Sequence, residues 1–371
     1  MFDLILLNNY EKLKLCPFVF NASTVLFQKI CVHLQSANPD FTSMPSTKNN
    51  ILRPQLFKFA LNLKTVLWGG DKLAAFKGVS LESSNVGESW EISGLKGHES
   101  IVEGGEHHGW SLRKLIKTYK QQLVGTRVYR KHGNEFPLLI KFIDAHKDLS
   151  VQVHPDDDLA RRRHNCSGKA EMWYIINAEP GASLLAGMSR TITPREYLEH
   201  MSRGTLLNVL ARHYTHKGDI FFLPAGRIHS IGSGNLLLEV QQSSDITYRV
   251  YDFDRIDTNG KPRELHTELA LDAIDYTTSS DCLRHYPNRA GNIRLINSIF
   301  FDVDRIMVDD TYHLEMPHDA FLCLMCVEGH ATINCGSSVL YDINQGESIL
   351  APACIHSLDF KGDATIITAT V

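Results

Sequence analysis

The amino-acid sequence has little of what marks a membrane-spanning, nucleic-acid-binding or nucleotide-binding protein. Its 371 residues contain no apolar run close to the ~20 residues that a membrane helix needs. Lys and Arg total 38 against 42 Asp and Glu, so the formal charge is only −4. Neither G-x-G-x-x-G nor G-x-x-x-x-G-K-[ST] occurs. We therefore expect neither membrane nor nucleic acid among its partners.

The sequence also lacks a disulfide framework. Eight cysteines in a chain of this length, with no signal-like segment, are typical of reduced thiols in a cytoplasmic protein. Cys323 and Cys326 form a lone C-x-x-C in AFLCLMCVEG, and on a strand they would point to opposite faces. We interpret both as core residues.

The first 50 residues differ from the rest of the chain in composition and in hydrophobic pattern. MFDLILLNNY is a short apolar start without the charge or cleavage site of a secretory signal, and NPDFTSMPSTKNN is typical of a loop. Met44 lies just before the first coherent strand pattern, LRPQLFKFAL. We expect residues 1–53 to be an extension that is disordered or lies upstream of the true translation start.

From Leu56 onward the pattern is mainly β, with short alternating runs between Gly and Pro. Helices are expected in a few places only, each with its own start signal. They are residues 111–125 with Ser111 as N-cap, residues 156–165, and one or two helices within 193–213 that begin at Thr193.

A weak internal repeat indicates two related β-sandwiches. Gly218-Asp219, followed by an apolar strand, Pro224 and His229, is echoed by Gly346-Glu347, a second apolar strand, Pro352 and His356. The second copy has no Q-x-H strand before it. We expect residues 54–280 to form a catalytic unit and residues 281–371 a degenerate, metal-free copy.

Four candidate metal ligands occur in strand-like or turn-like contexts. The alternation in LSVQVHPDD places Ser150, Gln152 and His154 on one face of a strand. Glu171 begins a second run, at a distance typical of a helix-containing connection to an adjoining strand, and His229 follows a bend. Each alone has an ordinary explanation, as a surface amide, a helix cap or an edge charge. Together they suit a zinc-type ion at a catalytic site.

Basic residues accompany these ligands. Lys141 interrupts the apolar strand LLIKFIDA, and Lys169 shares the face of the residue two positions later. Arg249 ends SSDITYR, where Asp245 and Thr247 share its face. Surface strand charges are the plain alternative. Cationic groups beside a metal favour an anionic substrate, and a sugar phosphate fits.

The blocks WGGDKL, GESWEIS, LSVQVHPDD, GKAEMWYII and QQSSDITYRVYDF resemble the type I phosphomannose isomerases, particularly the short bacterial form. The resemblance runs from Leu56 to the C-terminal strands. It implies two cupin-type jelly-roll sandwiches, one zinc ion per chain, and interconversion of mannose 6-phosphate and fructose 6-phosphate through a cis-enediol.

The resemblance also assigns residues. It implies Arg249 as the essential arginine and a metal held by Gln152, His154, Glu171 and His229. It places five further residues at the substrate: Ser150, Lys141, Lys169, Glu239 and Asp245. The proton-transferring base stays open among His229, Lys169, Glu239 and Asp245. A monomer or a homodimer is expected.

Three other classes of protein fit these residues less well. A cupin oxygenase usually has H-x-H rather than Q-x-H, and a non-catalytic sugar-binding cupin needs no cationic side chains around a full ligand set. A bifunctional enzyme with nucleotidyltransferase activity needs a Gly-rich nucleotide-binding domain, for which the sequence has no room.

Overall fold

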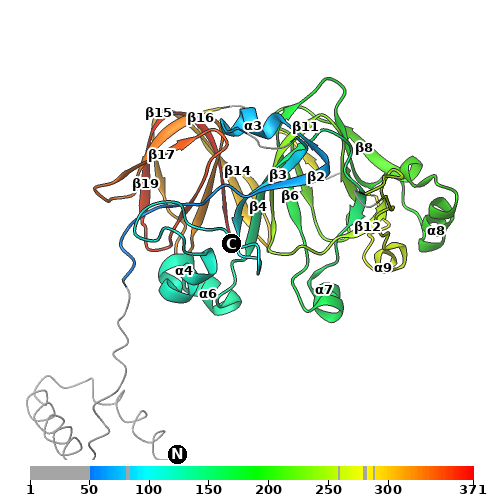
Figure 1. Ribbon diagram of the computed structural model, residues 1–371, viewed down its shortest axis with the longest axis horizontal. Coiled ribbons are helices and arrows are strands. Elements are labelled where there is room, and N and C mark those ends of the chain that lie inside the picture. The colour runs from blue at the N-terminus through cyan, green and yellow to red at the C-terminus, as the bar shows by residue number, and fades with distance from the viewer. Residues whose placement is uncertain (1–50, 81–83, 258–259, 279–281, 287–288) are drawn as a thin grey trace, which may run out of the picture. The chain divides into compact units, whose positions relative to one another are not determined.

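The computed structural model describes residues 51–371 except 81–83, 258–259, 279–281 and 287–288. The predicted extension falls almost wholly on residues 1–50, which lie outside the described residues. The described residues form three β-sheets in layers, with short helices at their edges (Figure 1). The prediction of a mainly β, cupin-type fold with a few short helices is confirmed.

Sheet I is the middle layer and has the strand order β13-β9-β6-β11-β4-β3-β2. Its strands are β2 (Leu63–Gly70), β3 (Val86–Ser93), β4 (Leu138–Ala145), β6 (Glu171–Ala178), β9 (Ile220–Leu223), β11 (Asn235–Gln242) and β13 (Leu283–Arg284). Strand β4 is buried along its whole length, because both faces of sheet I are covered.

Sheet II covers one face of sheet I and has the order β12-β5-β10-β7-β8. Its strands are β5 (Val151–Val153), β7 (Ser183–Met188), β8 (Leu210–Tyr214), β10 (His229–Ile231) and β12 (Tyr248–Tyr251). Trp173 and Leu237 of sheet I pack against Leu184 and Ala186 of sheet II. The two sheets therefore enclose a sandwich interior.

Sheet III covers the other face of sheet I, where Phe142 and Leu238 share a core with Val303 and Met325. Its strands are β1 (Phe57–Lys58), β14 (Gly291–Asn297), β15 (Asp302–Glu315), β16 (Leu322–Asn334), β17 (Leu340–Asn344), β18 (Ser348–Ala351) and β19 (Ser357–Thr370). The boundary between residues 54–280 and 281–371 stays a prediction, and β1 pairs with β18 in sheet III.

The long strands of sheet III bend where three residues with positive φ lie close together. Asp310 (φ 63°) pairs with Gly362 (φ 148°), and Gly329 (φ 76°) lies on the neighbouring strand. A Cβ at Gly362 would lie 2.4 Å from a carbonyl oxygen, so only glycine fits there. The bent sheet encloses a second core, which includes Ile306 and Phe360.

The sequence repeat is also a structural repeat. The order β9-β6-β11-β4-β3 in sheet I matches β18-β16-β19-β15-β14 in sheet III. The Gly218 N–H donates to the carbonyl of Ile175 at 2.8 Å, and the Gly346 N–H donates to that of Cys326 at 2.9 Å. Ile175 on β6 and Cys326 on β16 are therefore equivalent positions.

The helix predicted over residues 111–125 is wrong in extent. Ser111 caps its start by accepting from the Lys114 N–H at 3.2 Å, as expected. At Lys120 the backbone turns to φ 50°, which ends the helix. The segment continues as separate helices, so that the order is α4 (Leu112–Tyr119), α5 (Gln121–Val124) and α6 (Thr126–His132).

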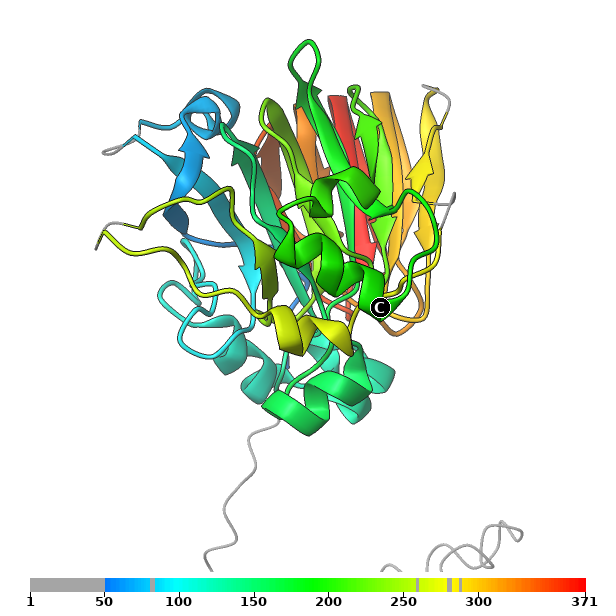
Figure 2. The same cartoon turned by 90° about the vertical axis from the view of Figure 1, so that its right-hand side faces the viewer.

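The other helices cover sheet II. They are α7 (Asp157–His164), α8 (Pro194–Ser202) and α9 (Thr267–Leu271), and α3 (Lys72–Lys77) lies apart near sheet III (Figures 1 and 2). Thr193 caps α8 through a capping box with Glu196. Residues 210–213, the end of the predicted helical region, belong to strand β8 instead. No helix within the described residues is long and apolar enough to span a membrane.

Cys323 and Cys326 lie on opposite faces of β16. Cys323 packs in the core between sheets I and III, and Cys326 packs in the core inside sheet III. Burial raises the pKa of Cys326 to about 12, so its thiol is protonated at neutral pH. The interpretation of both as core residues is confirmed.

Candidate metal centre and active site

Three neighbouring strands of sheet II present their side chains side by side. Gln152 on β5 pairs in register with His229 on β10 and with Arg249 on β12. The two valines of β5 point the other way, into the core beneath the helices, as the alternation predicted. His154 follows β5 directly and is buried.

Glu171 approaches the same point from sheet I, where it is the first residue of β6. Its Oε1 lies 3.1 Å from His229 Nε2, and its Oε2 lies 3.4 Å from His154 Nε2. Gln152 Nε2 lies 3.3 Å from His229 Nε2, and a half-turn of the amide would bring its oxygen there. In the part of the chain that the structure describes, only His154, Glu171 and His229 bring three such donor atoms within 4.8 Å.

Backbone carbonyls orient both imidazoles. His154 Nδ1 donates to the carbonyl of Ile246 at 2.9 Å, and His229 Nδ1 donates to that of Arg227 at 2.8 Å. A carbonyl accepts only, so each Nδ1 carries a proton. The Nε2 atoms of both rings face Glu171.

The charge state of this group fits a divalent cation. Burial and the nearby Lys169 lower the pKa of His154 to about 3, so the ring is neutral. Burial alone would raise the pKa of Glu171, but the nearby Lys169 ammonium holds it well below its usual range. His154 Nε2 and both Glu171 oxygens are buried without hydrogen-bond partners. Lone pairs that face a carboxylate are unfavourable unless a cation lies between them.

A cavity of about 350 Å³ lies between sheets I and II beside this group. The structure brings every predicted substrate-contacting residue to its wall. These residues are Lys141, Ser150, Lys169, Glu239, Asp245 and Arg249, together with Gln152.

Lys141 and Lys169 are each paired with a carboxylate. Lys141 Nζ lies 3.1 Å from Glu239 Oε1, and Lys169 Nζ lies 3.5 Å from Glu171 Oε2. Burial alone would lower the pKa of Lys141, but Glu239 raises it above its usual value. The Trp173 indole N–H fixes Glu239 by donating to its Oε2 at 3.0 Å. Both lysines therefore present charge without being unpaired.

Arg249, Thr247 and Asp245 line the cavity from β12 and the segment before it. Arg249 Nη1 donates to the carbonyl of Glu264 at 3.1 Å. Burial and the nearby Arg263 lower the pKa of Arg249, which stays a cation. Asp245 is exposed at the rim.

Several cavity residues went unassigned at the sequence level, among them Glu88, Trp90 and Arg263. Glu88 and Trp90 share one face of β3, where the Trp90 indole N–H donates to Glu88 Oε2 at 2.6 Å. The alternation in GESWEIS could have placed Glu88 and Trp90 on one face, since alternate residues of a strand share a face. Arg263 lies on a loop after β12 and had no periodic signal.

One prediction about the ligand spacing is wrong. The segment between His154 and Glu171 contains helix α7, as expected, but it does not lead to an adjoining strand. It connects β5 of sheet II to β6 of sheet I, across the sandwich. The ligands therefore meet from opposite sheets.

Fold and site together define a cupin-type protein with a candidate metal centre beside a charged cavity. The family model "Phosphomannose isomerase type I, catalytic domain" matches residues 56–184. The model "Mannose-6-phosphate isomerase, cupin domain" matches residues 293–371.

Curated relatives and solved structures agree with these models. Mannose-6-phosphate isomerase ManA of Bacillus subtilis is 34% identical over 310 residues, which are 82% of this chain and 96% of the relative. Mannose-6-phosphate isomerase of Streptococcus mutans is 32% identical over 82% of this chain and 94% of its own. A crystal structure of the mannose 6-phosphate isomerase from Bacillus subtilis matches with a TM-score of 0.76 and 29% identity, over 86% of this chain and 100% of that chain. The chain belongs to the type I phosphomannose isomerase family, and it is an isomerase.

Proposed function

We propose that this protein is a zinc-dependent mannose-6-phosphate isomerase, which interconverts mannose 6-phosphate and fructose 6-phosphate through a cis-enediol. The observation that carries the proposal is the buried group of two imidazoles and one carboxylate beside a cavity lined by cations. The relatives' names supply the substrate. Residues 54–280 are the catalytic unit in this proposal, and residues 281–371 carry no chemistry.

His154, Glu171 and His229 would hold the metal, with the amide oxygen of Gln152 as a fourth ligand. Three or four nitrogen and oxygen donors that leave one position open are the usual catalytic zinc set. Bound there, zinc acts as a Lewis acid that stabilises negative charge developing on the sugar oxygens.

The remaining side chains position the sugar and move its proton. Arg249, half-buried at the cavity wall, supports the anionic form of the reacting sugar, since a planar guanidinium binds oxyanions in two-pronged geometry. His229 has both nitrogens committed, Nδ1 to a carbonyl and Nε2 towards Glu171. The C2-to-C1 proton transfer then falls to Lys169, Glu239 or Asp245.

The test is a coupled assay for fructose 6-phosphate, run before and after chelation. We expect turnover of mannose 6-phosphate that chelation abolishes and that one equivalent of zinc restores. Turnover that survives complete removal of metal would contradict the metal-dependent mechanism. Absence of turnover in a fully zinc-loaded, folded protein would contradict the proposed substrate.

A further inference from the structure

The cavity holds a second guanidinium for which neither the sequence patterns nor the family resemblance supplied a role. Arg263 lines the cavity together with Arg249, on the side formed by β12 and the loop after it. Lys141 and Lys169 are committed to carboxylates elsewhere in the cavity. Arg263 is also paired with a carboxylate, that of Asp252, but a guanidinium has five N–H donors, so both arginines keep donors for an anionic group.

Arg263 is held by a buried carboxylate. Its Nε donates to Asp252 Oδ2 at 2.7 Å, and its Nη2 donates to Asp252 Oδ1. Asp252 also accepts from Arg255, and these two arginines hold its pKa below the usual range although burial alone would raise it. Two of the five N–H donors of Arg263 are used by Asp252, so its orientation is fixed while donors remain for a ligand.

The loop that carries Arg263 is fastened to Arg249. The His266 N–H donates to the Arg249 carbonyl at 2.7 Å, and the Arg249 N–H donates to His266 Nδ1 at 3.1 Å. The Arg249 side chain reaches the same loop at the carbonyl of Glu264. Backbone and side-chain bonds thus keep Arg263 beside Arg249.

Two guanidinium groups at one cavity wall repel each other. Arg263 contributes, after burial, to the lowered pKa of Arg249, and the Nε of Arg249 is buried without a partner. An anion between the two groups would relieve the repulsion and occupy the unused donors. A phosphate dianion suits this arrangement, because arginine binds phosphate oxygens in two-pronged, charge-assisted geometry.

We infer that Arg263 and Arg249 together form the subsite for the phosphate of the substrate, and that Arg263 determines the preference for a phosphorylated sugar. This inference rests on the proposed function. In this assignment Arg263 contacts the phosphate alone, Arg249 contacts both the phosphate and the oxyanion that develops on the reacting sugar, and the two lysines lie at the reacting end.

The test compares Arg263→Met and Arg263→Lys with a control, Lys261→Met. Lys261 is an exposed cation on the same loop and does not line the cavity. For Arg263→Met we expect the KM for mannose 6-phosphate to rise about 10- to 100-fold, because one charge-assisted interaction with the substrate is lost. Binding of inorganic phosphate, measured by calorimetry, should weaken in parallel, with kcat and metal content little changed.

Arg263→Lys should recover part of the phosphate affinity, and Lys261→Met should behave as the wild type. If Arg263→Met keeps the wild-type KM and phosphate affinity, the inference is overturned while the proposed function stands. If the zinc-loaded wild type does not convert mannose 6-phosphate, the proposed function fails, and phosphate calorimetry still decides the role of Arg263. Should Arg263→Met not fold, the Lys variant is compared with the wild type by the same two measurements.

Discussion

Sheets I and III have the same order of five strands, yet their equivalent positions hold different side chains. Glu171 lies four residues before Ile175 on β6, and Leu322 lies four residues before its equivalent, Cys326, on β16. The register agrees, because Glu171 pairs with Leu223 on β9 and Leu322 pairs with Ala351 on β18. The carboxylate of the candidate metal centre is thus replaced by a leucine.

The neighbouring strands differ in the same way, because the charged cavity residues of sheet I are replaced in sheet III by residues that form no such ion pair. Glu239 pairs with Lys141 in sheet I, and Thr368 pairs with Asp304 at the matching register of sheet III. The buried ion pair of the cavity has no counterpart at these positions. The two sheets share the glycine turn and the apolar interior, and both of these features serve the fold rather than the site.

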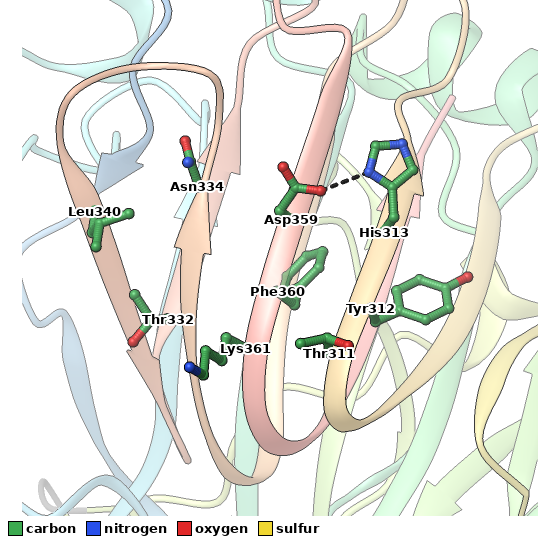
Figure 3. A pocket seen from close by; sticks show the side chains of 9 residues that line it. All are labelled: Thr311, Tyr312, His313, Thr332, Asn334, Leu340, Asp359, Phe360 and Lys361. Carbon is green, nitrogen blue, oxygen red and sulfur yellow. Dashed lines mark hydrogen bonds and ion pairs between the residues drawn. The ribbon is translucent and has the colours of Figure 1, made fainter.

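Sheet III forms no group of candidate metal ligands within the described residues. Its nearby cavity, about 530 Å³, is lined by the far ends of its bent strands (Figure 3). That cavity has a single imidazole, His313, whose Nδ1 lies 2.6 Å from Asp359 and whose Nε2 lies 3.1 Å from Glu315. A single exposed imidazole does not hold zinc against water. Of these two cavities, the one in sheet III is the larger, but it is not the candidate active site.

The largest difference between the two regions is expected when a histidine of each is replaced by alanine. His154→Ala should lose tightly bound metal and lower turnover more than about 100-fold, since even partners of metal ligands are worth 10- to 100-fold. The protein should stay folded, because little core volume is removed. His313→Ala in sheet III is the control and should leave both unchanged. Metal content by mass spectrometry and the coupled assay check both variants.

Arg249→Lys should lower turnover on the order of 100-fold with metal content unchanged. Lysine keeps the charge but loses the planar pair of donors that an oxyanion in the transition state needs. Arg294→Lys on β14, an exposed arginine of sheet III, is the matched control. Near-normal kinetics in Arg249→Lys would mean that a point charge suffices at that position.

Gln152→Ala should be milder than loss of an imidazole. A neutral amide contributes less to the binding of a cation than a carboxylate or an oriented imidazole, so metal affinity should fall about tenfold. Competition with a chelator of known affinity measures this change. An affinity equal to that of the wild type would remove Gln152 from the ligand set.

Leu322→Ala should affect stability and not chemistry. Leu322 is buried, and truncation of a buried leucine lowers the free energy of unfolding by about 2–5 kcal/mol. Folded protein should still bind one metal ion and turn over normally. Denaturant unfolding, measured together with the activity of the folded fraction, separates the two effects. Loss of metal from the folded variant would contradict this prediction and show that sheet III contributes to the metal site.

The sequence predicted the site better than the architecture around it. Strand alternation placed Ser150 and Gln152 on one face, and both line the cavity, because side-chain direction in a strand depends only on local backbone. The assignment of β5 and β6 to facing sheets depends on long-range pairing, which local periodicity does not report. The connection after His154 was for this reason misread as one between adjoining strands.

Features that depend on tertiary contacts had no local signal. Arg263 reaches the cavity because Asp252 fixes it, and the loop pattern alone does not show that contact. The helix break at Lys120 involves a positive φ at a residue type that rarely adopts it. The bend of sheet III at Gly329 and Gly362 is visible only once the strands are paired.

The most direct test of the difference between the two sheets is the number of tightly bound metal ions per chain. Mass spectrometry of purified wild type, His229→Ala and His356→Ala should give one, none and one. His229 belongs to the buried ligand group, whereas His356 is exposed just before β19 and has no ligand group around it among the described residues. Two equivalents in the wild type that fall to one in His356→Ala would contradict the account, because sheet III would then hold a metal site of its own.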